Sequence, residues 1–259
     1  MIRISFLITH YNRPEALRTC IESIKDVKSK NDEIIVSDDA SCDQVLHEIQ
    51  LLDYDKLIQS NTNQGLAANI NKGIRACNGA FIIYCQEDFT LDKKLKSKLP
   101  YFINVIEKGS IDMIRFSSYV FFNKLEPFCE HLSIIPKFRW QNFLQNFYRY
   151  SDHPFFIKND FYNRFGVYME NTSGRYGETE YGVRLSNSKA IIAITRESMA
   201  YLMEGNVSTL ASELPQSKVN RLTGKKLAKF IRAMRIYFEW AMYRNNKRGL
   251  ITYKNARQQ

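Results

Sequence analysis

The sequence lacks the features that mark several large classes of protein. It has no run of about 18 apolar residues, and its apolar opening stretch is short and soon interrupted, so we expect neither a membrane-spanning helix nor a signal peptide. It has five cysteines, an odd number without Cys-x-x-Cys spacing, which indicates neither a disulfide framework nor a zinc knuckle. These absences favour a cytoplasmic location and mostly buried thiols.

Two common nucleotide-binding signatures are also missing. The first apolar run is followed by Thr9-His10-Tyr11-Asn12-Arg13-Pro14 instead of Gly-x-Gly-x-x-Gly, which disfavours a nicotinamide-dependent enzyme. No P-loop pattern occurs either. The chain has 259 residues, 44% of them hydrophobic and 25% charged, which is enough to bury the core of one globular domain.

Positive charge is concentrated at the C-terminal end. The net charge of the chain is +10, and twelve of its Lys and Arg residues lie from Lys218 onward, against a single acid, Glu239. The rest of the chain is nearly neutral. The excess of positive charge therefore belongs to the C-terminal segment and not to the protein as a whole.

The first ninety residues alternate between short apolar runs and amphipathic segments. The runs predict strands over residues 4–8, 33–36, 56–58 and 81–85. Helices are predicted from Pro14, after Ser41 and over residues 66–77. This alternation predicts an α/β fold with a mainly parallel central sheet that is covered by helices on both faces.

The second half is less regular. We expect strands over residues 111–122, 155–157 and 191–194, and helices over residues 159–165 and from Glu178. The aromatic-rich stretch 138–150 is compatible with either helix or loop. We therefore expect one α/β globule with a more irregular second half.

Polar residues cluster where three of the predicted strands end. The clusters are Thr9-His10-Tyr11-Asn12, Ser37-Asp38-Asp39 and Gln86-Glu87-Asp88. In open α/β sheets, ligands bind at the carboxyl ends of the strands. The acids of the third cluster offer the oxygen ligands that suit Mg²⁺ or Mn²⁺ held against a diphosphate.

The order and spacing of these stretches resemble those of family 2 inverting glycosyltransferases with a GT-A fold. The matching stretches are residues 5–14, 33–41, 63–73, 79–88 and 177–184, which together span about residues 3–205. The resemblance implies a GT-A-like nucleotide-binding sandwich with a C-terminal basic helical tail. It also implies a division into residues 1–95 for the nucleotide sugar, 96–214 for the acceptor and 215–259 for the tail.

The resemblance implies an enzyme that moves a sugar from a nucleoside diphosphate donor to a saccharide hydroxyl with inversion. UDP is the expected nucleotide of the donor. The expected partners are the nucleotide-sugar donor and a saccharide acceptor. We favour an acceptor that is linked to a lipid. Such an enzyme serves the synthesis of cell-surface polysaccharide or lipopolysaccharide.

The resemblance also assigns residues to the nucleotide. Thr9, Tyr11 and Asp39 would line the uridine pocket, and Arg13 and Asn71 would lie near the ribose and the phosphates. The alternative for Asp39, as for its neighbour in the sequence, is a capping role after a strand.

Gln86-Glu87-Asp88 stands where the family has its Asp-x-Asp motif. Glutamine replaces the first acid, but Asp88 keeps the position of the direct metal ligand, so the resemblance implies Mn²⁺ or Mg²⁺ at Asp88. Glu87 either assists the metal or orients a ribose or sugar hydroxyl. The late histidine that completes the metal shell in many GT-A enzymes is missing, and Glu204 lies in the corresponding stretch.

The acceptor side is expected to carry the base. Glu178 falls where the family places its catalytic base, usually an Asp, and Glu180 is the rival candidate. A carboxylate is suited to this role because it can take the proton of a sugar hydroxyl as the new bond forms. Arg184 is expected to pair with one of these acids. His153 either touches the acceptor or is simply packed.

Residues 225–244 form a basic amphipathic pattern. A helix of this kind can rest on an anionic membrane surface, which would place the enzyme on the inner face of the membrane. The alternatives are packing on its own domain, an oligomer contact, or a nucleic-acid-binding module that uses the basic charge. We do not expect nucleic acid, because it leaves the acids at the strand ends unexplained. A non-catalytic relative that binds nucleotide or saccharide is a further alternative.

Overall fold

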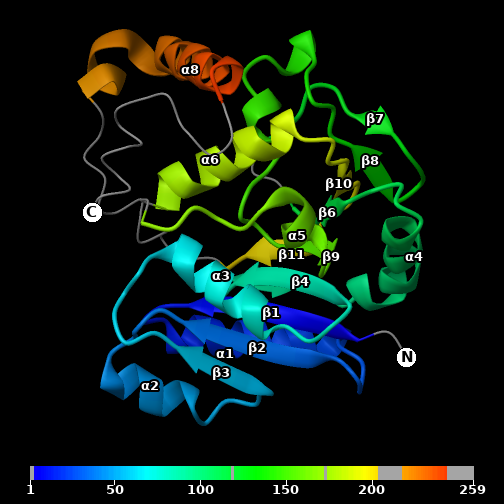
Figure 1. Cartoon of the computed structure of the whole chain (residues 1–259), viewed down its shortest axis with the longest axis vertical. Coiled ribbons are helices and arrows are strands. Elements are labelled where there is room, and N and C mark those ends of the chain that lie inside the picture. The colour runs from blue at the N-terminus through cyan, green and yellow to red at the C-terminus, as the bar shows by residue number, and fades with distance from the viewer. Residues whose placement is uncertain (1–2, 118–119, 172–173, 204–217, 244–259) are drawn as a thin grey trace.

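The architecture is built on one mixed β-sheet. The computed structural model describes residues 3–117, 120–171, 174–203 and 218–243. Its main strands are β1 (Ile4–His10), β2 (Glu33–Asp38), β3 (Lys56–Gln59), β4 (Phe81–Gln86), β6 (Met113–Arg115), β7 (Glu126–Pro127), β8 (Leu132–Ile134), β9 (Phe155–Lys158) and β10 (Ile192–Thr195). Within the described residues they form a nine-stranded sheet in the order β3-β2-β1-β4-β9-β6-β10-β8-β7 (Figure 1).

The N-terminal half of this sheet is parallel. β1 pairs in parallel with β2 and with β4, and β2 pairs in parallel with β3. β9 is antiparallel to both of its neighbours, β4 and β6, and so joins the two halves of the sheet. The predicted α/β fold with a mainly parallel central sheet is confirmed.

Helices cover both faces, as predicted. Successive residues of β1 point to opposite sides: Phe6 and Ile8 belong to one buried cluster and Leu7 belongs to the other. The first cluster is completed by α1 (Pro14–Val27), α2 (Asp43–Ile49) and α4 (Leu95–Glu107). The second is completed by α3 (Leu66–Ala76), α5 (Phe161–Phe165) and α6 (Gly174–Asn187).

The second half departs from the sequence prediction in several places. Among the described residues of the strand expected over 111–122, only β6 is strand. Phe116 bonds outside the ladder, because its N–H donates to the Pro154 carbonyl and its own carbonyl accepts from the Met199 N–H. α4 was not expected, nor was the small antiparallel ribbon of β5 (Phe89–Leu91) with β11 (Ala200–Leu202). The aromatic-rich stretch forms the short 3₁₀ helices η1 (Trp140–Asn142) and η2 (Asn146–Tyr148).

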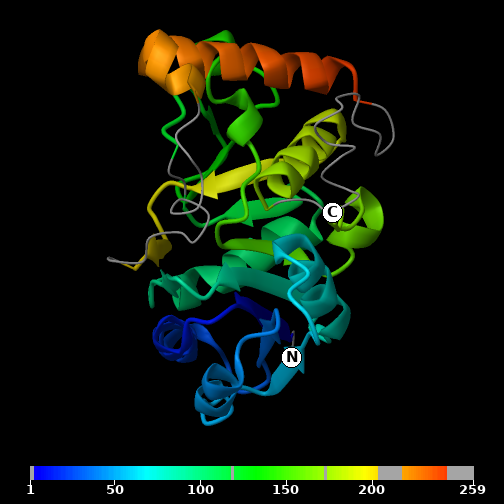
Figure 2. The ribbon, with the colours of Figure 1, turned by 90° about the vertical axis from the view of Figure 1, so that its left-hand side faces the viewer.

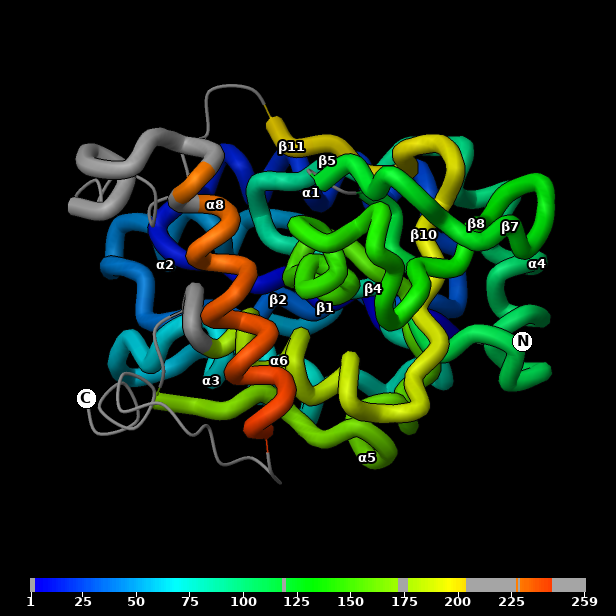
Figure 3. The backbone as a smooth tube through the Cα atoms, turned by 90° about the horizontal axis from the view of Figure 1, so that it is seen from above, coloured from blue at the N-terminus to red at the C-terminus, as the bar shows by residue number. Residues whose placement is uncertain are grey.

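The basic segment forms α8 (Lys218–Ala241), which lies across one end of the molecule, far from α2 (Figures 1 and 2). Seen from above, α8 crosses over α6 (Figure 3). Ala233 and Ile236 are buried, and the Tyr237 hydroxyl donates to the Phe143 carbonyl, so one face of α8 packs on the globule. The predicted helix is confirmed, and so is the alternative that it packs on its own domain. No helix in the described part of the chain is long and apolar enough to cross a membrane.

The proposed divisions of the chain at residues 95 and 214 stay predictions. The sheet and both buried clusters draw on residues from either side of the first division.

Candidate active site

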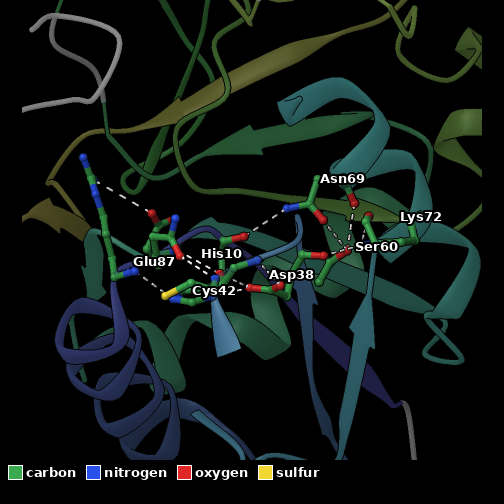
Figure 4. Close-up of polar contacts among 11 residues, drawn as sticks. His10, Asp38, Cys42, Ser60, Asn69, Lys72 and Glu87 are labelled. Carbon is green, nitrogen blue, oxygen red and sulfur yellow. Dashed lines mark hydrogen bonds and ion pairs between the residues drawn. The ribbon is translucent and has the colours of Figure 1, made fainter. Parts of the chain in front are cut away.

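The carboxyl ends of β1, β2 and β4 meet at one edge of the sheet. Thr9 is in register with Gln86 across β1 and β4, and His10 is in register with Asp38 across β1 and β2. His10 Nδ1 and Asp38 Oδ2 lie 2.7 Å apart, and both side chains are fully buried (Figure 4). The structure thus brings together the three polar stretches that the sequence singled out.

Asp38 anchors the loop that follows β2. Its carboxylate accepts hydrogen bonds from the Ser41 N–H at 2.9 Å and from the Ser41 hydroxyl, in addition to its contact with His10. Burial by itself would raise the pKa of Asp38, but the hydrogen bonds from His10 and Ser41 outweigh burial and lower that pKa. Lys72 of α3 donates to the Asp38 carbonyl and ties α3 to the same edge (Figure 4).

Asp39 holds the start of α3. Its two carboxylate oxygens accept from the backbone N–H groups of Gln64 at 2.9 Å and Gly65 at 2.8 Å. Gly65 has a φ of 85°, a conformation that favours glycine. Asp39 therefore holds the loop that leads into α3, whose first helical residue is Leu66, and does not cap the helix that follows it in sequence. Each carboxylate oxygen keeps a second acceptor position, so this geometry still allows Asp39 to accept from a base.

Two further nucleotide candidates lie at different depths. Tyr11 is 39% exposed and stands at the rim of the strand-end edge. Thr9 is buried, with its hydroxyl 3.1 Å from the Tyr84 hydroxyl. Tyr11 is therefore open to contact with a ligand, whereas the Thr9 side chain already has a partner inside the protein.

Asn71 is buried and its amide is used inside the protein. The amide nitrogen donates to the Tyr168 carbonyl at 2.8 Å and to Glu170 at 2.9 Å, and the amide oxygen accepts from the Tyr168 N–H. These contacts give Asn71 the role of fastening α3 to the segment before α6. The expectation that Asn71 lies near the ribose and the phosphates stays a prediction.

The turn after β4 carries an acidic pair next to Arg13. Arg13 Nη1 lies 3.3 Å from Asp88 Oδ2 and 3.9 Å from Glu87 Oε1. Burial and the neighbouring Asp88 raise the pKa of Glu87 to about 8, and burial also raises the pKa of Asp88. This position of Arg13 is compatible with its expected role near the phosphates.

This turn fits a divalent cation that is shared with a diphosphate. Among the described residues, Asp88 Oδ1 is buried and has no hydrogen-bond partner. The same part of the chain contains no cluster of three or more His, Cys, Asp or Glu side chains that would form a metal cage. One or two carboxylates, completed by phosphate oxygens and water, are the usual ligands of Mg²⁺ at nucleotides. Glu204 lies outside the described residues.

Glu178, in the second turn of α6, belongs to a neighbouring pocket. It lines this pocket with Asp152 and Gly177, and α3 contributes Leu66, Ala67 and Ile70. The Glu178 and Asp152 side chains are hydrogen-bonded to each other. Burial, followed by the nearby Asp152 carboxyl, raises the pKa of Glu178 to about 8. Burial also raises the pKa of Asp152.

Glu180 is placed differently from Glu178. It is fully buried, and Arg184 donates to both of its carboxylate oxygens, at 3.1 and 2.6 Å. Arg184 also donates to the Val167 carbonyl at 2.7 Å. Arg184 therefore pairs with one of the two acids, as the sequence suggested, and its hydrogen bond to Val167 fastens α6 to the segment before it.

His153 is packed against the Phe89 ring, with the ring centroids 5.1 Å apart. Burial and the nearby Arg115 lower the pKa of His153 to about 3, so its ring is neutral at physiological pH. Of the two roles that the sequence left open for His153, the packed one agrees with these contacts.

Sequence reasoning missed Asp152 and Arg115. Asp152 directly precedes His153, and only the antiparallel placement of β9 beside β4 brings it to the site. The Gln86 side chain donates to the Asp152 carbonyl at 3.3 Å across this strand pair. Arg115 lies inside a stretch whose pattern predicts an ordinary strand. Its charge within that otherwise apolar run was the signal that could have singled it out.

The fold and the site together define the GT-A class of α/β sandwich, with an acidic turn at the strand ends and a carboxylate pocket beside it. The sequence model of glycosyl transferase family 2 matches residues 5–171, and the chain belongs to this family.

Among solved structures, the chain is similar to S. aureus TarS 1–349 in complex with UDP-GlcNAc, with a TM-score of 0.63 and 16% identity over 95% of this chain and 68% of that chain. It is also similar to the mannosyltransferase PcManGT from Pyrobaculum calidifontis in complex with GDP-Man and Mn²⁺, with a TM-score of 0.55 and 12% identity over 76% of this chain and 55% of that chain. These likenesses confirm the GT-A fold.

Among curated proteins, the chain is 36% identical over 88 residues to the putative glycosyltransferase EpsH of Bacillus subtilis, which is 33% of this chain and 26% of that protein. It is 32% identical over 93 residues to the GalNAc(5)-diNAcBac-PP-undecaprenol beta-1,3-glucosyltransferase of Campylobacter jejuni, which is 34% of this chain and 30% of that protein. The matches thus span less than a third of the length of either relative.

Proposed function

We propose that this protein transfers a sugar from a nucleoside diphosphate donor to a saccharide hydroxyl with inversion at the anomeric carbon. UDP is the nucleotide that we propose for the donor. The observation that carries the proposal is the position of Gln86, which ends β4 beside the acidic turn and at the same time contacts Asp152 of the pocket that holds Glu178. A donor diphosphate at the turn and an acceptor hydroxyl at the pocket would then be neighbours.

Each side chain has a definite part in this reaction. Arg13 and Tyr11 bind and orient the donor, and Asp39 accepts from the base. Glu178 takes the proton of the acceptor hydroxyl while the bond from that oxygen to the anomeric carbon forms. The bond from the anomeric carbon to the phosphate oxygen breaks at the same time, and its electron pair leaves with UDP. Mn²⁺ or Mg²⁺ at Asp88, when bound, supplies a Lewis acid that neutralises the diphosphate.

The acceptor is proposed to be a lipid-linked saccharide in the synthesis of cell-surface polysaccharide or lipopolysaccharide. The support is the name of the Campylobacter jejuni relative, which includes a PP-undecaprenol carrier. A second support is the outward face of α8, which we call the α8 outer face. It consists of Leu227, Phe230, Ile231, Met234, Phe238 and Met242, each between 45% and 55% exposed.

The α8 outer face has the composition of an interfacial helix. Lys229 and Arg235 lie among its apolar side chains, and Trp140 of η1, which is 76% exposed, stacks on Phe143 beside Phe230. Apolar side chains interleaved with basic ones favour peripheral binding to an anionic lipid surface. We therefore propose that the protein works on the cytoplasmic face of the membrane, close to its acceptor.

The proposed activity is tested with the purified full chain and a panel of UDP- and GDP-sugars in the presence of Mn²⁺. UDP and one or more UDP-sugars are expected to raise the melting temperature, and release of UDP is expected to accelerate when a lipid-linked saccharide is added. If no nucleotide of the panel changes the melting temperature, the proposed donor class is wrong.

A further inference from the structure

The pocket that Glu178 lines contains a second carboxyl group. Asp152, from the loop before β9, and Glu178, from α6, both line it and are hydrogen-bonded to each other. Two carboxylates in hydrogen-bond contact cannot both carry a charge without a large repulsion, so such a pair normally retains one proton.

The surroundings supply a cation that balances one negative charge. Arg115 of β6 is fully buried and interacts electrostatically with both carboxyls. Its guanidinium donates hydrogen bonds to the Tyr148 carbonyl at 2.7 Å and to the Ser151 hydroxyl at 2.8 Å. Burial lowers the pKa of Arg115 to about 10, so it remains a cation at neutral pH. The cation and the two carboxyls are electrically balanced when the pair holds a single proton.

The other neighbours do not alter this balance. Tyr84 of β4, Tyr150 of the loop before β9 and Tyr168, which lines the pocket, are hydroxyls whose pKa values burial raises far above neutral. Asp88, after β4, is a further acid that disfavours a second negative charge. α3 lines the pocket with apolar side chains alone.

We propose that Asp152 is a positioning residue for Glu178, and that the two carboxyls act as a pair that shares one proton and accepts a second one from the acceptor hydroxyl. This inference rests on the proposed function, since it concerns how the base of that reaction is held. The contact between the two carboxyls favours the proton on Glu178, so Glu178 faces the acceptor as a carboxylate in the state in which the shared proton has moved to Asp152. After the transfer the pair is neutral, and it returns one proton to water.

The first test needs neither donor nor acceptor. Infrared difference spectra of the full chain, recorded as a pH titration, are expected to show a protonated carboxyl that disappears near pH 8 and is absent in Glu178→Gln. In Asp152→Asn this signal should disappear about one pH unit or more lower, because the neighbouring carboxyl is gone while burial of Glu178 remains. Glu87 is another acid with a raised pKa in the region, so the signal is assigned by its loss in Glu178→Gln. If the signal titrates at the same pH in Asp152→Asn as in the unmodified protein, the shared-proton pair is wrong.

The second test uses the pH dependence of turnover. In the unmodified protein the rate should rise with pH toward about 8, the pKa of Glu178. Asp152→Asn removes the neighbouring carboxyl and should move this rise to lower pH by about one unit or more, with UDP-induced stabilisation retained. An unchanged pH profile in this variant would overturn the proposal.

The matched control is Asp160→Asn, at the other end of β9, where the side chain is 43% exposed and pairs with Lys158. This control should leave both the infrared signal and the pH profile unchanged. Absence of any transfer by the unmodified protein would count against the proposed function, whereas the infrared result would still decide whether the pair exists.

Discussion

Two acids of this molecule, Asp38 and Glu178, have opposite environments. Asp38 lies at the end of β2 and accepts hydrogen bonds from His10 and Ser41, which lower its pKa. Glu178 lies in α6 beside another carboxyl, and its pKa is raised to about 8. Both side chains are acids near one edge of one sheet, yet only the second of them is held in a form that can exchange a proton near neutral pH.

The difference separates acids that hydrogen-bond donors of the protein hold in place from acids that are available for proton transfer or for binding a metal. Asp39 and Glu180 resemble Asp38, because their carboxylates are occupied by backbone amides or by Arg184. Asp88 resembles Glu178, because burial raises its pKa and one of its oxygens has no hydrogen-bond partner among the described residues. Incompletely satisfied charges are costly and are therefore characteristic of functional sites.

The largest effect is expected where the comparison assigns proton transfer. Glu178→Gln keeps the shape of the side chain but cannot accept a proton, so turnover should fall by about 10²-fold or more. Stabilisation by UDP should remain, because the proposed donor site lies at the strand ends. The measurement is the rate of UDP release with donor and acceptor, together with melting temperatures.

Glu180→Gln is the matched control on the same helix. It breaks a buried ion pair, so its main effect should be on the free energy of unfolding, with a loss of about 3 kcal/mol. If Glu180→Gln folds normally and is inactive while Glu178→Gln works, the two acids have been assigned in the wrong order.

The next effect concerns the structural side of the comparison. Asp38→Asn removes the charge that receives hydrogen bonds from His10 and Ser41, and it should lower the free energy of unfolding by about 2–3 kcal/mol. Because the folded pKa is depressed, the stabilisation by Asp38 is present above its ordinary value of 3.8 and is lost as the pH falls through the lower folded value. Urea denaturation of both proteins over this pH range measures the difference, which should disappear only at the acid end.

The sequence predicts one side of this comparison better than the other. The strand ends at Thr9, Asp38 and Gln86 follow local apolar runs, and parallel strands bring their carboxyl ends together without further information. The case of Asn71 is different, because its spacing fits the family motif, whereas its amide contacts depend on Tyr168, far away in the sequence.

The acceptor side depends on contacts that no local pattern encodes. Asp152 meets Glu178 only because β9 runs antiparallel between β4 and β6, a choice that the sequence does not reveal. Arg115 is an unusual residue for a buried strand, and its partners include carbonyls of the 3₁₀ region. The family motif identified Glu178, but it did not predict that Glu178 pairs with Asp152.

A smaller effect is expected at the acidic turn. UDP with Mn²⁺, at about a hundredfold excess over its dissociation constant, should stabilise the protein by about 2–3 kcal/mol. Asp88→Asn should remove most of the contribution of the metal, and Mn²⁺ binding can be followed directly by the loss of the free-ion signal in electron paramagnetic resonance. Equal Mn²⁺ binding by the unmodified protein and by Asp88→Asn would place the metal elsewhere.

The smallest effect is expected at the α8 outer face. Ile231→Ser combined with Met234→Ser removes apolar surface from side chains that are about half exposed, so folding should be preserved. Affinity for anionic vesicles should fall about tenfold, since each side chain loses part of its burial in the lipid interface. Binding should also weaken as salt rises, because basic residues contribute to it.

Point variants are preferable to truncation before Lys218, because Ala233 and Ile236 pack on the globule and their loss would expose apolar surface. Leu51→Ser is the matched control, since Leu51 is 86% exposed and follows α2, at the end of the molecule away from α8 (Figure 1). Sedimentation with vesicles should show normal binding by Leu51→Ser and reduced binding by the double variant. Equal binding by all three proteins would mean that the α8 outer face does not contact lipid, and the proposed membrane location would then have lost its structural support.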